Sequence, residues 1–161
     1  MYSAIMVMGV SGCGKSTIGA GLADAIGGVF LDGDDYHPAE NVAQMAAGQP
    51  LNDAMRWPWL DALGQAVQAA RADQPVVFAC SALKKSYRDH LRAAVPDLKI
   101  AYLEAPRDVV TARLAERQGH YMPPSLLDSQ LATLEVPQNA AAVVRIDQPI
   151  PAIIAALQRI V

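Results

Sequence analysis

The sequence predicts an α/β fold in which helices cover both faces of a parallel sheet. Short apolar runs alternate with longer helical patterns, and the runs lack the apolar–polar alternation of half-exposed strands. The chain has 161 residues, 52% of them hydrophobic, which suffices for one domain with its own core. Because no repeat and no linker rich in proline, glycine or serine divides it, we expect a single domain over residues 1–161.

The first half of the chain opens with the apolar run AIMVM at residues 4–8, which predicts a buried strand. A helical pattern over residues 15–26 follows, and two glycines mark its end. Residues 29–31 predict a brief second strand. Prolines then open two expected helices, one from residue 38 to the glycine at 48 and one over residues 58–72.

The second half continues the alternation. Helical patterns over residues 107–118 and 125–134 are separated by a pair of prolines, and apolar residues from Ile150 to Val161 share one helical face. Three further apolar runs predict strands, at residues 76–79, 99–103 and 143–146. Ligands of a parallel sheet covered by helices bind beyond the carboxyl ends of its strands, so the residues after each strand are the candidate site.

The segment after the first strand fits G-x-x-x-x-G-K-[ST] between an expected strand and an expected helix. Its glycines let backbone N–H groups turn inward around a phosphate, and the helix N-terminus adds partial positive charge. We expect Lys15 to reach the β- and γ-phosphates of ATP and Ser16 to bind Mg²⁺; a glycine-rich turn without a ligand is the alternative. The expected nucleotide-binding residues are Gly9, Val10, Ser11, Gly12, Cys13, Gly14, Lys15, Ser16 and Thr17.

Aspartates follow the second expected strand, whereas the third ends in Cys80. We expect Asp32 to order Mg²⁺ directly or through water, and Asp34 to accept a proton from a substrate hydroxyl or to orient it. With Asp35, three carboxylates would crowd together and repel one another without a cation, which favours a metal site over a plain turn.

Several blocks of the sequence are typical of far fewer protein families than the phosphate loop is. They are HP at 37–38, PWL at 58–60, CSALK at 80–84 and LLDSQ at 126–130. Together with the loop they closely resemble the gluconokinase family, which transfers the γ-phosphoryl group of ATP to the 6-hydroxyl of D-gluconate. The resemblance covers roughly residues 5–137. It implies a three-layer P-loop fold similar to shikimate and nucleoside-monophosphate kinases, with five parallel strands in the order 2-3-1-4-5, a mobile lid and, in many members, a homodimer.

A sugar acid needs a cation for its carboxylate and polar side chains for its hydroxyls. Arg56 is the expected partner of the carboxylate or of a phosphate, because a guanidinium can bind either in a bidentate manner. Lys84 and Arg88 are secondary candidates, and both also suit the solvated start of a helix. His37 either caps a helix or, because it lies near Asp34, binds the substrate.

The lid is expected over roughly residues 113–130. Arg113 and Arg117 lie four residues apart on one helical face, where a bound polyphosphate would offset their repulsion. By the resemblance, Arg113 would lie near the nucleotide and Arg117 near the transferring phosphoryl group, with His120 inside the moving segment as a substrate contact. Alternatively, Glu116 neutralises Arg113 on a solvated face.

Charge and cysteine content limit the other classes. Lys plus Arg is 13 and Asp plus Glu is 16, a net charge of −3, which gives no general attraction to nucleic acid or acidic membranes. Two cysteines, with no signal segment or long apolar stretch, favour free thiols in the cytoplasm. The remaining alternatives are a kinase for another acceptor, such as shikimate, a nucleotide or a related sugar acid, and a nucleotide-dependent switch protein.

Overall fold

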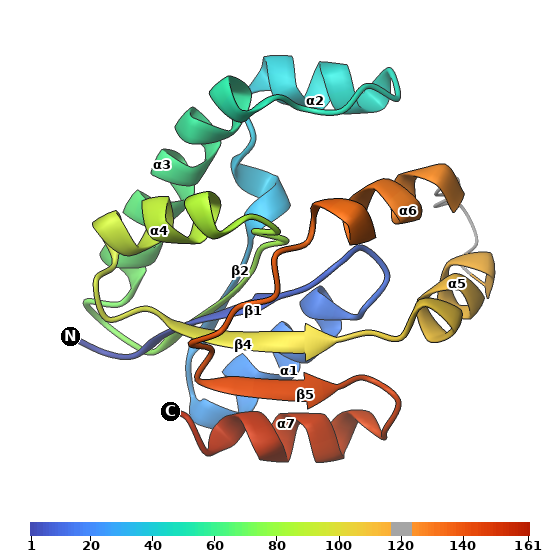
Figure 1. Ribbon diagram of the computed structural model, residues 1–161. Coiled ribbons are helices and arrows are strands. Elements are labelled where there is room, and N and C mark those ends of the chain that lie inside the picture. Colours follow the sequence, from blue (N-terminus) through green and yellow to red (C-terminus); the bar gives the residue numbers. More distant parts are fainter. Residues whose placement is uncertain (117–123) are drawn as a thin grey trace.

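A computed structural model describes residues 1–116 and 124–161 as a parallel five-stranded sheet between layers of helices (Figure 1). The strand order is β2-β3-β1-β4-β5, which confirms the order that the resemblance implied. Every paired neighbour runs parallel, so the carboxyl ends of the strands share one edge. The strands are β1 (Ala4–Met8), β2 (Val29–Asp32), β3 (Val76–Ala79), β4 (Lys99–Glu104) and β5 (Ala142–Arg145).

Two helical layers bury the two faces of the sheet. On one face α1 (Lys15–Ile26) packs beside α7 (Ile150–Gln158), and on the other α3 (Asp53–Ala70) packs beside α4 (Lys85–Ala94) (Figure 1). The remaining helices and one 3₁₀ turn lie in the connections between strands. They are η1 (Gly33–Tyr36) and α2 (Ala39–Ala46) after β2, and α5 (Arg107–Glu116) and α6 (Pro124–Thr133) after β4.

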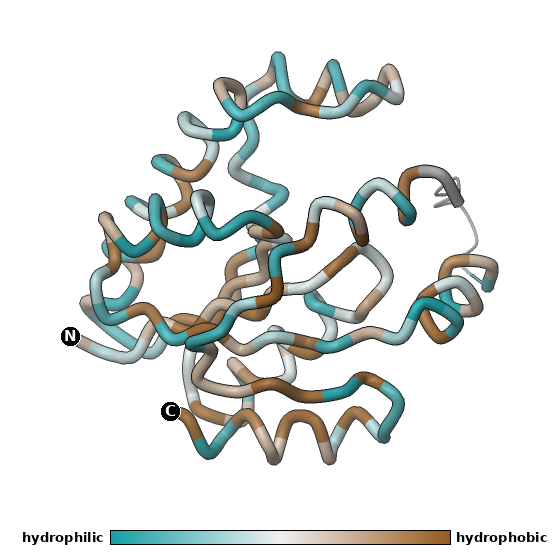
Figure 2. Tube along the Cα trace, in the orientation of Figure 1, coloured by the Kyte–Doolittle hydropathy of each residue, from teal (hydrophilic) through white to brown (hydrophobic). Residues whose placement is uncertain are grey.

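The central strand β1 explains the absence of alternation in the apolar runs. Its Ile5 and Val7 pack with α1 and α7, whereas Met6 and Met8 pack with α3 and α4. All four side chains have an exposed fraction of 0%, because both faces of the sheet are covered. In Figure 2 the strands are coloured largely as hydrophobic, whereas α4 is largely hydrophilic.

The expected start of one helix was wrong. α3 begins at Asp53 rather than at Pro58, because the side chain of Asn52 accepts a hydrogen bond from the backbone N–H of Met55 and caps the first turn. Pro58 lies inside this helix, where it lacks the N–H that would otherwise continue the ladder. The earlier start places Arg56 on the helix itself.

The other boundaries differ from expectation by a few residues. β2 extends through Asp32, which puts that carboxylate at the end of the strand. The C-terminal helix ends at Gln158, before the last residues of the expected apolar face. Among the described residues, no helix is both long and apolar enough to cross a membrane.

Candidate active site

The phosphate loop joins β1 to α1 in a left-handed backbone that only glycine adopts easily. Gly12 and Gly14 have φ angles of +82° and +92°, and a Cβ at Gly12 would lie 2.9 Å from the side chain of Leu114. No side chain caps α1 at Gly14, so the N–H groups of its first turn are left for an anion. The geometry of the loop therefore suits a phosphate group.

Lys15 and Arg113 place two cations against this loop. The Lys15 Nζ donates to the carbonyl of Val10 across the loop at 3.2 Å. From α5, the Arg113 guanidinium donates to the carbonyls of Cys13 at 3.5 Å and Ile146 at 3.0 Å. Burial raises the pKa of the Cys13 thiol despite the neighbouring Lys15, so the thiol is neutral and only the backbone of this residue is available to a ligand.

The end of β2 reaches the start of α1 through one side-chain contact. The Ser16 hydroxyl donates to the Asp32 Oδ2 at 3.1 Å, and the Asp32 Oδ1 accepts the backbone N–H of Asp34 at 3.0 Å. The three carboxylates do not form the expected cluster, because no group of three or more ligating side chains occurs in the described residues, and Asp34 and Asp35 are both exposed. A hydroxyl and one carboxylate remain as adjacent oxygen donors.

His37 follows the same turn and lies flat on Trp59. Their ring centroids are 4.1 Å apart with planes inclined by 16°, and the Trp59 Nε1 donates to the Gly33 carbonyl at 2.7 Å. Burial lowers the pKa of His37, Asp34 opposes that change and Arg56 adds to it. The sequence predicted the proximity of His37 to Asp34 but not the stacking of His37 on Trp59.

Arg56 belongs to a side-chain network that the sequence did not reveal. Its Nε donates to the hydroxyl of Tyr87 at 3.1 Å, and its guanidinium lies 5.1 Å from the centroid of that ring. The Tyr87 hydroxyl donates to Asp53 Oδ1 at 2.6 Å, and Lys84 Nζ lies 3.4 Å from the same oxygen. The hydrogen bond from Tyr87 lowers the pKa of Asp53. Arg56 and Lys84, both of which we expect to contact the acceptor, thus lie in one network around Tyr87.

Arg88 has different surroundings from those expected of a substrate contact. Its side chain is buried, and its guanidinium donates to the carbonyls of Ala82 at 2.8 Å, Leu83 at 3.1 Å and Glu135 at 2.8 Å. Ala82 has a φ of +40°, a backbone conformation that costs energy outside glycine. The geometry indicates that Arg88 supports this strained turn after β3 rather than presenting its donors to a ligand.

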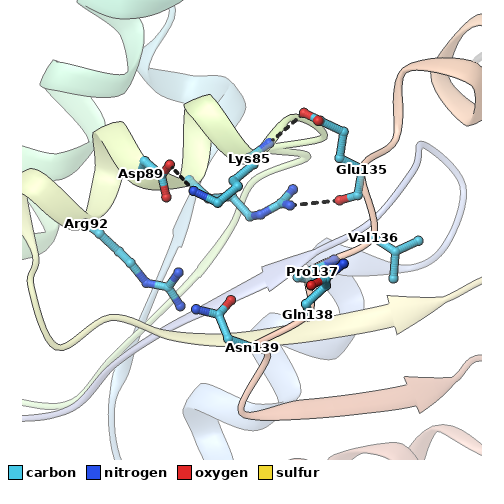
Figure 3. Close-up of a pocket in the computed structure, with 9 residues that line it drawn as sticks. Lys85, Asp89, Arg92, Glu135, Val136, Pro137, Gln138 and Asn139 are labelled. Carbon is cyan, nitrogen blue, oxygen red and sulfur yellow. Dashed lines mark hydrogen bonds and ion pairs between the residues drawn. The ribbon is translucent and has the colours of Figure 1, made fainter.

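A cavity of about 430 Å³ adjoins Arg88 between α4 and residues 135–139 (Figure 3). Figure 3 shows Lys85 directed to Asp89, and Arg92 and Asn139 among the lining residues in the lower part of the view. None of its described lining residues belongs to the phosphate loop or to the Asp32–Asp34 turn. The cavity is therefore separate from the candidate active site.

Gln130 is a site residue that the sequence analysis missed. From α6 its Oε1 accepts the backbone N–H of Ser11 at 2.8 Å, and its Nε2 donates to the Ser11 Oγ at 3.0 Å. Figure 1 shows α6 lying beside the loop that joins β1 to α1. The LLDSQ block was a usable signal, although the sequence does not show which of its residues turns toward the loop.

Two predicted site residues, Arg117 and His120, lie outside the described residues, as does the middle of the expected lid. Of the proposed lid, α5 up to Glu116 and α6 from Pro124 are described, and each hydrogen-bonds to the phosphate loop, α5 through Arg113 and α6 through Gln130.

Comparison with known proteins gives a consistent result. The protein-family profile described as "AAA domain" matches residues 5–137. The thermoresistant gluconokinase of Escherichia coli K12 is 44% identical over 93% of this chain and 88% of its own length, and the gluconokinase of Gluconobacter oxydans is 46% identical over 88% and 80%. A crystal structure of a gluconokinase from Sinorhizobium meliloti matches with a TM-score of 0.86 and 46% identity, covering 98% of this chain and 92% of that one. A shikimate kinase from Aquifex aeolicus, with a TM-score of 0.59 and 15% identity, shares the fold alone.

Proposed function

The chain belongs to the gluconokinase family, and we therefore propose that it transfers the γ-phosphoryl group of ATP to the 6-hydroxyl of D-gluconate. One observation in the fold carries the proposal: the Ser16–Asp32 hydrogen bond joins the phosphate loop to the turn that bears Asp34. A phosphate donor and a hydroxyl acceptor can therefore meet at one edge of the sheet. The proposed enzyme is cytoplasmic, as expected from the sequence, and a homodimer, as the family resemblance implies.

The phosphate loop binds ATP in this proposal. Phosphoryl transfer requires positioning and charge compensation more than covalent chemistry. The loop N–H groups and Lys15 supply positive charge at the β- and γ-phosphates, and Arg113 adds a second cation from α5. Arg117 takes the corresponding role at the transferring phosphoryl group.

Ser16 at the start of α1 and Asp32 at the end of β2 fit Mg²⁺. A hydroxyl and a carboxylate are hard oxygen donors, and magnesium sites in phosphoryl-transfer enzymes commonly use one or two such groups with water and phosphate oxygens. Ser16 and Asp32 would hold the ion, which when bound neutralises charge on the phosphate oxygens.

Gluconate binds on the opposite side of the transferring group. Arg56 pairs with the carboxylate of gluconate, and further polar contacts to gluconate come from Lys84, His37 and His120. The exposed Asp34 orients the 6-hydroxyl and accepts its proton. Arg88 has no place in this scheme, because its guanidinium is engaged by three main-chain carbonyls.

A coupled assay of ADP release tests the proposed function. We expect ATP turnover that depends on D-gluconate and exceeds turnover with shikimate, nucleoside monophosphates or related sugar acids. Faster turnover with another acceptor would show that the protein is a kinase whose substrate is not gluconate. Nucleotide binding without phosphorylation of any of them would instead support a switch protein.

Replacing Gln130 with alanine is expected to weaken ATP binding about tenfold, because two hydrogen bonds that fix Ser11 are lost and the loop becomes less preorganised. The KM for gluconate should change little. Isothermal titration with ATP measures the effect, with Ser129→Ala on the exposed face of α6 as the control. Unchanged ATP affinity would show that this contact is incidental to the loop.

Replacing Tyr87 with phenylalanine is expected to raise the KM for gluconate about five- to tenfold, because the hydroxyl that holds Arg56 and Asp53 is removed. The KM for ATP should stay within about twofold, since the network does not reach the loop. Steady-state kinetics at saturating co-substrate separate the two constants, with the exposed Tyr2→Phe as control. An equal rise in both KM values would contradict a role confined to the acceptor.

A further inference from the structure

The plane of the His37 ring is fixed by its neighbours. His37 is half-buried between η1 and α2 and stacks on Trp59, whose indole is itself held by the carbonyl of Gly33. Gly33 begins the turn that carries Asp34. The imidazole is therefore tied to the same turn as the proposed base, and only its protonation pattern remains to be specified.

Asn41 specifies that pattern. Its side chain has an exposed fraction of 1%, and its Nδ2 donates to the Met55 carbonyl at 2.8 Å and lies 3.2 Å from the His37 Nδ1. A carbonyl oxygen only accepts, so the amide atom facing Met55 must be the nitrogen. That nitrogen has no lone pair to offer, so His37 Nδ1 must accept from it. In the neutral ring the proton then resides on Nε2.

The charged form of His37 is disfavoured by the same contact. An imidazolium would carry a proton on Nδ1 directed at the Asn41 amide hydrogens, two donors with no acceptor between them. Burial acts in the same direction, while the charges that face the ring are of opposite sign, Asp34 and Arg56. The Nδ1 of His37 is thus engaged, and the ring has a single N–H, that of Nε2, left to donate.

We propose that Asn41 is a positioning residue that fixes His37 as a neutral Nε2–H donor to an oxygen of the acceptor. The inference rests on the proposed function, because Asp34 and Arg56, the charged groups that act on the ring, are the groups assigned there to gluconate. It also separates the roles of His37 and Asp34 at the site. The only lone pair of the His37 ring is engaged by Asn41, so His37 cannot take the proton of the attacking hydroxyl, and that task stays with Asp34.

The tautomer can be measured directly on the unmodified protein. Long-range ¹H–¹⁵N spectra distinguish the two neutral tautomers and the imidazolium, and the chain has only three histidines to assign. His37→Gln identifies the His37 signals by their loss. We expect the Nε2–H pattern at pH 7.5, and an Nδ1–H or imidazolium pattern would overturn the inference.

Substitution separates a tautomer role from a packing role. Asn41→Asp offers His37 only acceptor oxygens, so we expect a switch toward the Nδ1–H form and a KM for gluconate raised about tenfold with an unchanged KM for ATP. Should Asn41→Asp fail to fold, His37 variants carry the same test. His37→Gln, which keeps an N–H donor, should retain the KM for gluconate within about threefold, and His37→Leu should raise it about tenfold or more.

Equal KM values for these two His37 variants would contradict the donor role. The two levels of the proposal fail differently. Absence of gluconate turnover in the unmodified enzyme would remove the proposed function, whereas normal turnover with the wrong His37 tautomer would remove only the assignment of Asn41.

Discussion

Alanine in place of Lys15 is expected to lower kcat/KM for ATP about 10²–10³-fold, the largest loss of any single substitution outside the Asp34 turn. The Lys15 Nζ already lies across the phosphate loop, 3.2 Å from the carbonyl of Val10, so its charge is positioned before the substrate arrives. Preorganised charge of this kind acts on the transition state more than on the ground state, because negative charge shifts among the phosphate oxygens during transfer. We therefore expect kcat to fall more than ATP affinity.

The Lys15→Ala effect is checked by steady-state kinetics together with ATP titration of the same variant. Lys85→Ala provides a matched control, since Lys85 is an exposed lysine whose ammonium pairs with Asp89 at 2.6 Å and takes no part in the site. A thermal melt close to that of the unmodified protein excludes misfolding. Retention of more than about a tenth of the activity would show that the loop N–H groups and the remaining cations bind the phosphates adequately without Lys15.

The elements that the sequence predicted are those encoded locally. The run AIMVM and the glycines around Lys15 identify β1, the loop and α1 without reference to distant residues. The Ser16–Asp32 contact fits the expectation that both residues bind Mg²⁺, because a parallel sheet brings the ends of its strands to one edge. Local pattern and one rule of topology were enough for this half of the site.

The parts that the sequence missed depend on contacts between distant residues. Nothing local distinguishes Arg56, which lies over Tyr87, from Arg88, whose guanidinium is taken up by main-chain carbonyls including that of Glu135. Gln130 meets Ser11 across 119 residues of sequence. Such assignments require the packing of α4 and α6 against the rest of the fold, which no periodicity reports.

Asparagine in place of Asp34 is expected to lower kcat about 10²–10⁴-fold while leaving the affinity for ATP unchanged. The backbone N–H of Asp34 is held by the Asp32 Oδ1 at 3.0 Å, so the turn keeps its shape when the side chain loses its basicity. The Asp34 carboxylate itself is exposed at the edge where the loop and the turn meet. An amide of the same size can still orient a hydroxyl, but it cannot take its proton.

Comparison with Asp35→Asn isolates that loss. Asp35 is the next residue of the same 3₁₀ turn and is equally exposed, so its substitution removes the same charge from nearly the same place. If general electrostatics mattered, the two variants would slow turnover alike; if proton transfer matters, only Asp34→Asn would. Full turnover by Asp34→Asn would mean that the hydroxyl attacks without a side-chain base, because compensation of charge around Lys15 is then sufficient for the reaction.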